Sequence, residues 1–190
     1  MEDIVMISDR FLEEVVVKKN KAFNEVLYYL SWVIIVISAF VAIMGFNTVT
    51  FSLTSGTGFD WMSLIFTLVT AGIAVYCFFF HDKLRLEYEY TFTNGALDFA
   101  EVYNNKKRKS LGSLNTRNIE AFGKVSGSAF QRYLNMPNVK RMNWFLNRDA
   151  ELFYFYFEKD SQKRIIIIEP SQEMIANIKK YIPQGVWQNN

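Results

Sequence analysis

Two long stretches without a charged residue constrain this chain more than any other feature. Residues 26–46 form one run of 21 such residues, and residues 61–80 form another of 20. At 1.5 Å per residue, each run would make a helix of about 30 Å, the thickness of the hydrocarbon core of a bilayer. The alternative is a pair of core helices in a soluble protein, but such helices normally keep one polar face. The pattern therefore predicts a transmembrane helical hairpin over residues 26–80, with spans at 26–46 and 61–80.

The distribution of basic residues predicts the orientation of this hairpin. Three lysines, Lys18, Lys19 and Lys21, precede the first span, and Lys83 and Arg85 follow the second. The connecting segment, residues 47–60, contains no lysine or arginine. By the positive-inside rule, we expect a two-pass protein of the cell membrane with both termini in the cytoplasm.

After the hairpin, apolar residues alternate with polar ones, as in a half-buried strand. Tyr88, Tyr90 and Phe92 alternate with Glu87, Glu89 and Thr91, and Asn94-Gly95 follows at once as a tight-turn signal. Further strands are expected at residues 96–103, 106–111, 118–125, 129–134 (a weaker one), 139–146, 151–158 and 163–169. Leaving the weaker one aside, we therefore expect roughly seven antiparallel strands that begin as a meander, and the doubly apolar segment 151–158 is expected to be central.

The end of the chain changes to helical periodicity. Pro170 and Ser171 provide a stop and an N-cap, Met174, Ile175 and Ile178 share one face, and Pro183 ends the segment. This pattern predicts an amphipathic helix that covers an open end of the sheet, because such a helix removes apolar surface from water.

This layout resembles the membrane-anchored bacterial PH-like proteins, and most of all an uncharacterised family of small bacterial membrane proteins. The residues that carry the resemblance are the opening hairpin Tyr88 to Gly95, the strand start Lys106 to Lys109 with Leu111, the segment Asn118-Ile119-Glu120 and the helix start Pro170-Ser171. The resemblance implies two transmembrane helices followed by a PH-like seven-stranded antiparallel β barrel or sandwich capped by a C-terminal helix. It implies the fold alone and brings no catalytic residues.

The expected domain organisation has four parts. Residues 1–25 carry Ile4, Ile7, Phe11 and Val15 at helical spacing, which predicts an amphipathic N-terminal helix. Residues 26–80 are the hairpin, residues 81–183 are the cytoplasmic PH-like domain, and residues 184–190 are a tail.

A basic cluster is the candidate binding site. Residues 81–190 hold 17 basic and 12 acidic side chains, and Lys106, Lys107, Arg108 and Lys109 are their densest group. Each cation near an anionic leaflet gains about 1 kcal/mol. The cluster is therefore a candidate for contact with an anionic membrane surface; a merely solvated turn and a site for a specific anionic ligand are the alternatives.

Composition and motifs argue against most enzyme classes. One cysteine and one histidine leave little for metal or triad chemistry, and no nucleophile-elbow, Walker or metal-spacing motif occurs. We therefore expect no catalytic residues, no cofactor and no metal, and we expect neither nucleic acid nor a small-molecule substrate as a partner.

The sequence favours a membrane-tethered interaction or scaffold module. Its partners would be the lipid bilayer and either a membrane protein or a second copy of the chain. An accessory subunit of a transporter or channel is an alternative, since small residues such as Ala42, Gly45 and Gly72 permit close helix contact. A third hypothesis is a small membrane enzyme that uses His81 or the pair Glu87 and Glu89.

Overall fold

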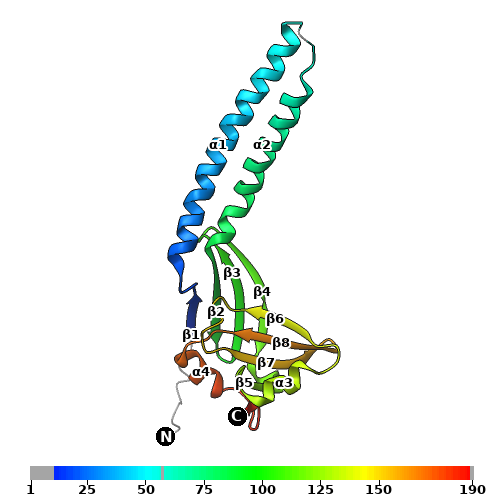
Figure 1. The fold of residues 1–190 in the computed structure, drawn as a ribbon. Coiled ribbons are helices and arrows are strands. Elements are labelled where there is room, and N and C mark those ends of the chain that lie inside the picture. The colour runs from blue at the N-terminus through cyan, green and yellow to red at the C-terminus, as the bar shows by residue number, and fades with distance from the viewer. Residues whose placement is uncertain (1–10, 57, 189–190) are drawn as a thin grey trace. The chain divides into compact units, whose positions relative to one another are not determined.

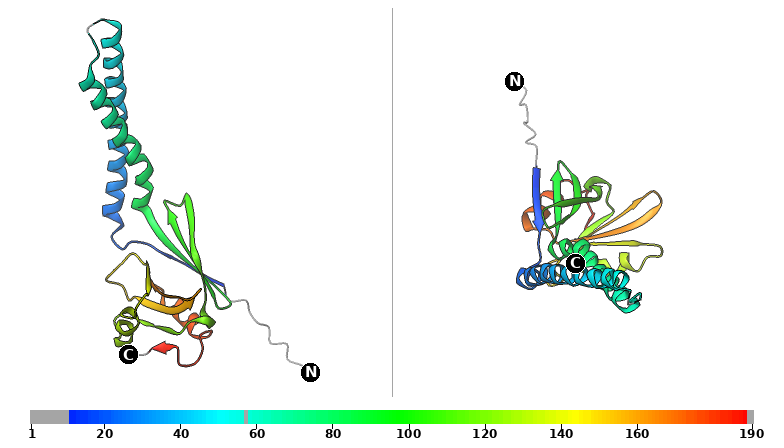
Figure 2. Two further views of the ribbon diagram at one scale, coloured as in Figure 1. Left: turned by 90° about the vertical axis from the view of Figure 1, so that its right-hand side faces the viewer. Right: turned by 90° about the horizontal axis from the view of Figure 1, so that it is seen from above.

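The computed structural model describes residues 11–56 and 58–188, which fold as two compact units (Figures 1 and 2). One unit is helical and covers residues 20–86. The other combines the described residues up to Lys19 with those from Glu87 onward. The β domain is thus discontinuous in sequence, because the helical hairpin is inserted between its first strand and the rest. This corrects the expected boundaries, which began the domain at residue 81.

The helical unit consists of two long helices and a short 3-10 helix. They are α1 (Lys21–Thr54), α2 (Trp61–Phe80) and η1 (His81–Arg85). Both α1 and α2 are long and apolar enough to cross a membrane, and only 6% of the most apolar window of each is buried in the protein. The core helices of a soluble protein would instead be mostly buried.

Helix α1 is longer than the expected span of 26–46. The hydroxyls of Thr48, Thr50 and Thr54 bond to carbonyls one turn earlier, at distances of 2.9 to 3.2 Å. The polar side chains after residue 46 thus form their hydrogen bonds within the helix. This segment is therefore helical where a loop was expected. The carboxylate of Asp60 caps α2 by accepting from the Ser63 amide at 3.1 Å.

The first sheet, sheet A, has the strand order β1-β2-β3-β4. Its strands are β1 (Phe11–Val16), β2 (Leu86–Thr93), β3 (Ala96–Tyr103) and β4 (Lys107–Asn115). The tight turn between β2 and β3 is confirmed: Asn94 and Gly95 have φ values of 49° and 94°. A Cβ at Gly95 would lie 2.9 Å from Cδ1 of Tyr181, so glycine is required there for space as well as for conformation.

The N-terminal segment is a strand where a helix was expected. Within β1, Phe11, Glu13 and Val15 are exposed while Val16 is buried, and Val16 pairs with Tyr88 of β2. The helix prediction is therefore wrong for residues 11–16; its other members, Ile4 and Ile7, lie outside the described residues. A short sequence that suits both periods took the strand form because β2 offers it an edge with which to pair.

The second sheet, sheet B, has the order β6-β8-β7-β5-β9. Its strands are β5 (Ala121–Lys124), β6 (Lys140–Trp144), β7 (Phe153–Lys159), β8 (Gln162–Ile168) and β9 (Trp187–Gln188). Strand β7 is central, as predicted from its apolar residues on both faces. The short strand β9, which pairs with β5, lies in the segment expected to be a tail.

Three further expectations about the meander are corrected. Residues 129–134, expected as a weak strand, belong to helix α3 (Ser128–Leu134). Residues Thr116–Asn118 form the 3-10 helix η2, which shortens the expected strand 118–125. Two strand pairs, β6 with β8 and β5 with β9, are parallel. The described residues therefore hold nine strands in two sheets, of which sheet B is of mixed direction, in place of a seven-stranded antiparallel barrel or sandwich.

Alternating residues of β7 build the core on both sides of sheet B. Tyr154 and Tyr156 pack with Phe130 of α3, while Phe155 stacks on Phe122 at 4.7 Å between ring centroids. The inner face of sheet A adds its own fully buried residues. These are Tyr90, Phe92, Leu97 and Phe99.

Helix α4 (Gln172–Lys179) follows the prediction closely. The hydroxyl of Ser171 accepts from the Met174 amide at 3.1 Å and caps the helix, and Met174, Ile175 and Ile178 are buried. Just beyond it, Tyr181 packs against Phe92 of sheet A at 5.4 Å between ring centroids.

Tyrosine hydroxyls join the two sheets. The Tyr90 hydroxyl donates to the Trp144 carbonyl and accepts from the Glu169 amide, the latter at 3.3 Å. The Tyr88 hydroxyl reaches the Asn143 carbonyl at 3.5 Å. Two side chains of β2 thus satisfy backbone carbonyls of β6, the edge strand of sheet B.

A buried asparagine holds the chain just before the hairpin. The Asn147 side chain donates to the Val17 carbonyl at 2.9 Å and accepts from the Lys19 amide at 2.8 Å. It also donates to the Glu169 carboxylate at 2.8 Å. The Asn147 side-chain amide thus forms hydrogen bonds with the backbone of residues 17 and 19, much as a neighbouring strand would. These bonds extend the attachment of β1 to the domain.

Candidate functional site: the basic end of sheet A

The four basic residues of the predicted cluster lie in the β3–β4 turn and at the start of β4. The turn contains Asn104 and Asn105, with φ values of 51° and 52°, and the Lys106 amide donates to the Tyr103 carbonyl at 3.0 Å. Asparagine tolerates this left-handed conformation better than most residues, so the turn stays tight. We call Lys106, Lys107, Arg108 and Lys109 the basic end.

Strand register places the basic end at the end of sheet A from which the chain continues into the helical hairpin. Lys107 is opposite Tyr103 in the β3–β4 pair. Because the β2–β3 turn has two residues, Tyr103 in turn faces the beginning of β2, which is the first strand after the hairpin. On the other side, Val16 at the end of β1 pairs with Tyr88. The chain therefore leaves sheet A and returns to it at the same end that carries the four basic residues.

Two of the four cations have acidic partners on β2 and β3. The Arg108 guanidinium lies 2.8 Å from the Glu89 carboxylate, and the Lys109 ammonium lies 3.4 Å from that of Glu101. The side chains of Arg108 and Lys109 remain 59% and 62% exposed, whereas those of Glu89 and Glu101 are 17% and 16% exposed. The cations thus face solvent, whereas the carboxylates are more buried.

The Glu101 carboxylate also orders a neighbouring phenol. It accepts a hydrogen bond from the Tyr103 hydroxyl at 2.7 Å, and this bond, together with burial, raises the pKa of Tyr103 to about 12. Burial is the main cause that raises the pKa of Tyr88, with Glu101 contributing. Both phenols are neutral at physiological pH and add no negative charge to the basic end.

The structure divides the cluster by position. Lys106 and Lys107 belong to the turn and the first position of β4, whereas Arg108 and Lys109 are held along the sheet by Glu89 and Glu101. The ion pairs found among the described residues do not include Lys107. Lys107 is therefore the member best placed to meet an external anion.

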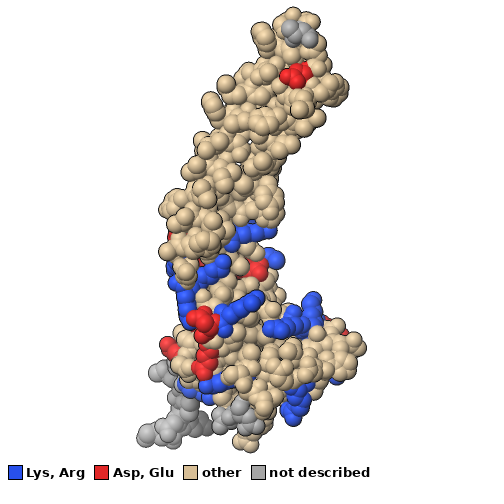
Figure 3. Space-filling view, viewed as in Figure 1, with Lys and Arg blue, Asp and Glu red and all other residues tan. Residues whose placement is uncertain are grey.

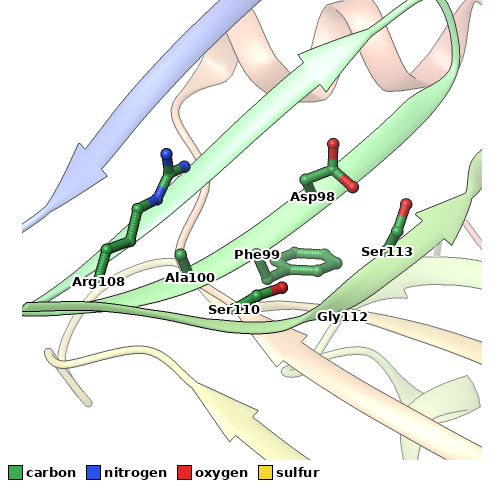
Figure 4. A pocket seen from close by; sticks show the side chains of 7 residues that line it. All are labelled: Asp98, Phe99, Ala100, Arg108, Ser110, Gly112 and Ser113. Carbon is green, nitrogen blue, oxygen red and sulfur yellow. The ribbon is translucent and has the colours of Figure 1, made fainter.

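A shallow hollow of about 400 Å³ lies beside the basic end on the outer face of sheet A (Figure 4). Its lining residues are Asp98, Phe99, Ala100, Arg108, Ser110, Gly112 and Ser113. A bulge between Phe99 and Ala100 shifts the β3–β4 register here, and Gly112 has a positive φ of 145°. The sequence alone does not reveal the hollow, because it depends on this bulge and on pairing across two strands.

Two residues of the enzyme hypothesis, Glu89 and His81, each have partners within their own unit. Glu89 is bound to Arg108, and Arg85 pairs with Glu25 of α1. His81 is buried in the helical unit, where its Nδ1 lies 2.6 Å from the Phe78 carbonyl oxygen. Within the described part of the chain, no three His, Cys, Asp or Glu residues are grouped as metal ligands would be.

Charge is unevenly distributed over the surface. In the face shown in Figure 3, the surface formed by the two long helices is almost free of charged side chains, whereas Lys and Arg side chains occur across the β domain. This distribution agrees with the uncharged runs in the sequence.

Comparison with known proteins identifies a family. A family model described as "Bacterial PH-like domain (DUF6106)" matches residues 8–188, nearly the whole chain, including both long helices. No curated protein and no solved structure matches the chain.

Proposed function

Because the chain belongs to the bacterial PH-like domain family, we propose that it is a membrane-tethered interaction module at the cytoplasmic face of the cell membrane. In this role α1 and α2 are the tether, and the two-sheet domain presents a binding surface close to the bilayer. The role contains no chemical step, in keeping with the lack of catalytic motifs in the sequence.

The strand pairing of β1 supports a two-pass topology. Strand β1 precedes the hairpin in sequence, β2 follows it, and the two pair over six residues. Segments that share one sheet must be on one side of a membrane, because a sheet cannot form through a bilayer. The flanking lysines Lys18, Lys19 and Lys21 favour the cytoplasmic side.

The position of the basic end is the observation that supports binding to anionic lipid headgroups. Lys106 and Lys107 lie at the end of sheet A from which the chain continues into the hairpin, and only the five residues of η1 separate α2 from β2. Anionic headgroups attract each nearby cation by about 1 kcal/mol. We therefore assign Lys106 and Lys107 to direct headgroup contact, with Arg108 and Lys109 strengthening the local field.

Hydrogen exchange of the full chain in nanodiscs tests this contact. We expect the turn and the start of β4, residues 103–109, to exchange more slowly in discs containing phosphatidylserine than in discs of phosphatidylcholine alone. The double charge reversal Lys106→Glu and Lys107→Glu should abolish the difference. The matched control, Lys140→Glu with Arg141→Glu on the exposed part of β6, should retain it. Equal exchange in both kinds of disc for the unmodified protein would rule out headgroup contact.

One observation also favours the accessory-subunit role. Gly45 is used within the hairpin, where it packs against Thr67, but a Cβ at Gly72 would have no atom within 4 Å. A small exposed residue on α2 leaves room for a helix of another membrane protein. Native-size analysis in mild detergent tests this role, and a lone monomer would count against it.

A further inference from the structure

Strand β4 is a long edge strand with an open side. It is the last strand of sheet A and pairs only with β3, and seven of its nine residues are exposed. Strand β6, an edge of sheet B, has carbonyls occupied by Tyr88 and Tyr90, and β9 is only two residues long. An open edge presents backbone N–H and C=O groups that can pair with an added strand. No proline interrupts β4, so every residue keeps its backbone donor.

The hollow leaves space for side chains beside this edge. Its floor includes Ala100 and Gly112, and a Cβ at Gly112 would have no atom within 4 Å. Ser110, Ser113 and Arg108 of β4 stand around it, as Figure 4 shows. An added strand could therefore place alternate side chains over this face and exchange hydrogen bonds with the two hydroxyls.

The distribution of charge along β4 favours one direction for a strand that is added at its open edge. Residues 107–109 are all basic, whereas the six residues that follow are uncharged. In an antiparallel pair, the first half of β4 faces the C-terminal half of its partner. A complementary strand would have an uncharged N-terminal half and an acidic C-terminal half.

A second copy of the chain does not suit this edge. Parallel pairing in register would set the three cations of β4 opposite the same three cations, which is unfavourable. In each copy, the chain continues into the helical hairpin from one end of sheet A. Antiparallel pairing of two β4 strands would place these two ends about 30 Å apart, since each strand residue adds about 3.3 Å. The two hairpins would then start from opposite ends of the shared sheet, which is a poor arrangement for two copies in one membrane.

We propose that β4 accepts an extended segment of a partner protein as an antiparallel fifth strand of sheet A. The segment is uncharged where it faces residues 110–115 and acidic where it faces residues 107–109. This inference builds on the proposed function by naming the kind of partner that the tethered module binds. Arg108 and Lys109 provide its charge recognition.

Three labelled ten-residue peptides test the inference on the full chain in phosphatidylcholine nanodiscs. The first alternates Thr and Val in its N-terminal half and Glu and Val in its C-terminal half. The second has the two halves exchanged, and the third is the first with alternate backbone nitrogens methylated. We expect the first to bind at least about tenfold more tightly than either of the others, because the exchanged order misplaces the charges and methylation removes backbone donors. Hydrogen exchange should slow at residues 107–115 when it binds.

Two results would overturn the inference. One is equal binding of the methylated and unmethylated peptides, which would mean that no strand forms; the other is no binding of the first peptide at millimolar concentration. On the protein side, Arg108→Gln should weaken the first peptide about tenfold, whereas the matched surface change Lys140→Gln should not. Because the discs contain no anionic lipid, failure here leaves the headgroup proposal standing, and failure of the headgroup experiment leaves this one standing.

Discussion

The Asn147 side chain helps to hold the chain in front of the first long helix. Asn147 is 8% exposed, and its side chain makes hydrogen bonds to Val17, Lys19 and Glu169. Removing it would leave part-buried backbone groups and a carboxylate oxygen with fewer partners. We expect Asn147→Ala to lower the free energy of unfolding by about 2 kcal/mol, measured by chemical denaturation in mild detergent. Asn135→Ala, at an exposed position after α3, is the control and should have little effect.

Glu14 should give the stability of the domain a pH dependence. Its carboxylate accepts from the Ser171 amide at 2.7 Å, but burial, with smaller contributions from Glu169 and Glu173, raises its pKa above the ordinary value of 4.5. Folding then favours the protonated form, so the ionised group costs stability at neutral pH. This cost should disappear as the pH falls through the raised pKa toward 4.5.

The comparison of Glu14→Gln with the unmodified protein isolates this effect. The unmodified protein should gain stability relative to Glu14→Gln as the pH is lowered from 7, and denaturation at a series of pH values measures the difference. Glu13→Gln, at the exposed neighbouring position, controls for the change in total charge. A difference that stays constant with pH would show that Glu14 is not the responsible group.

At the element scale, the packing of α1 on α2 depends on one close approach. A Cβ at Gly45 would collide with the hydroxyl of Thr67, which is itself fixed by a 2.7 Å bond to the Ser63 carbonyl. Gly45→Ala should therefore destabilise the hairpin by about 1 to 3 kcal/mol, through overpacking. Gly72→Ala is a matched control, since it adds the same methyl group to open space. Thermal unfolding of both variants in detergent measures the contrast, and equal stability would mean that the helices do not pack at Gly45.

At the scale of the whole molecule, the discontinuous domain predicts which segments share one side of the membrane. Strand β1 precedes the hairpin and β4 follows it, yet both belong to sheet A. In a background with Cys77→Ser, cysteines introduced at Glu13 and Ser113 should react with an impermeant thiol reagent from the same side. A cysteine at Ser55, between the helices, should react only from the other side. Opposite labelling of Glu13 and Ser113 would contradict the pairing of β1 with β2 within one chain.

The features that can be predicted from the sequence are those with a local physical cause. The hairpin follows from two uncharged runs long enough to span a bilayer, the β2–β3 turn from Asn94-Gly95, and the start of α4 from the cap at Ser171. Each depends on neighbours within a few residues, so the pattern is visible in the chain. The basic cluster was visible for the same reason, since its four members are consecutive.

The pairing of distant segments cannot be predicted from local sequence and is seen only in the folded domain. The segment Phe11–Val16 suits either a helix or a strand, and pairing with β2, some 70 residues away in sequence, made it a strand. Likewise, the position of Lys106 and Lys107 beside the exit to the hairpin, the open edge of β4 and the bonds of Asn147 depend on long-range register. Local propensity cannot set such register, because its free energy comes from contacts that exist only once the sheets have formed.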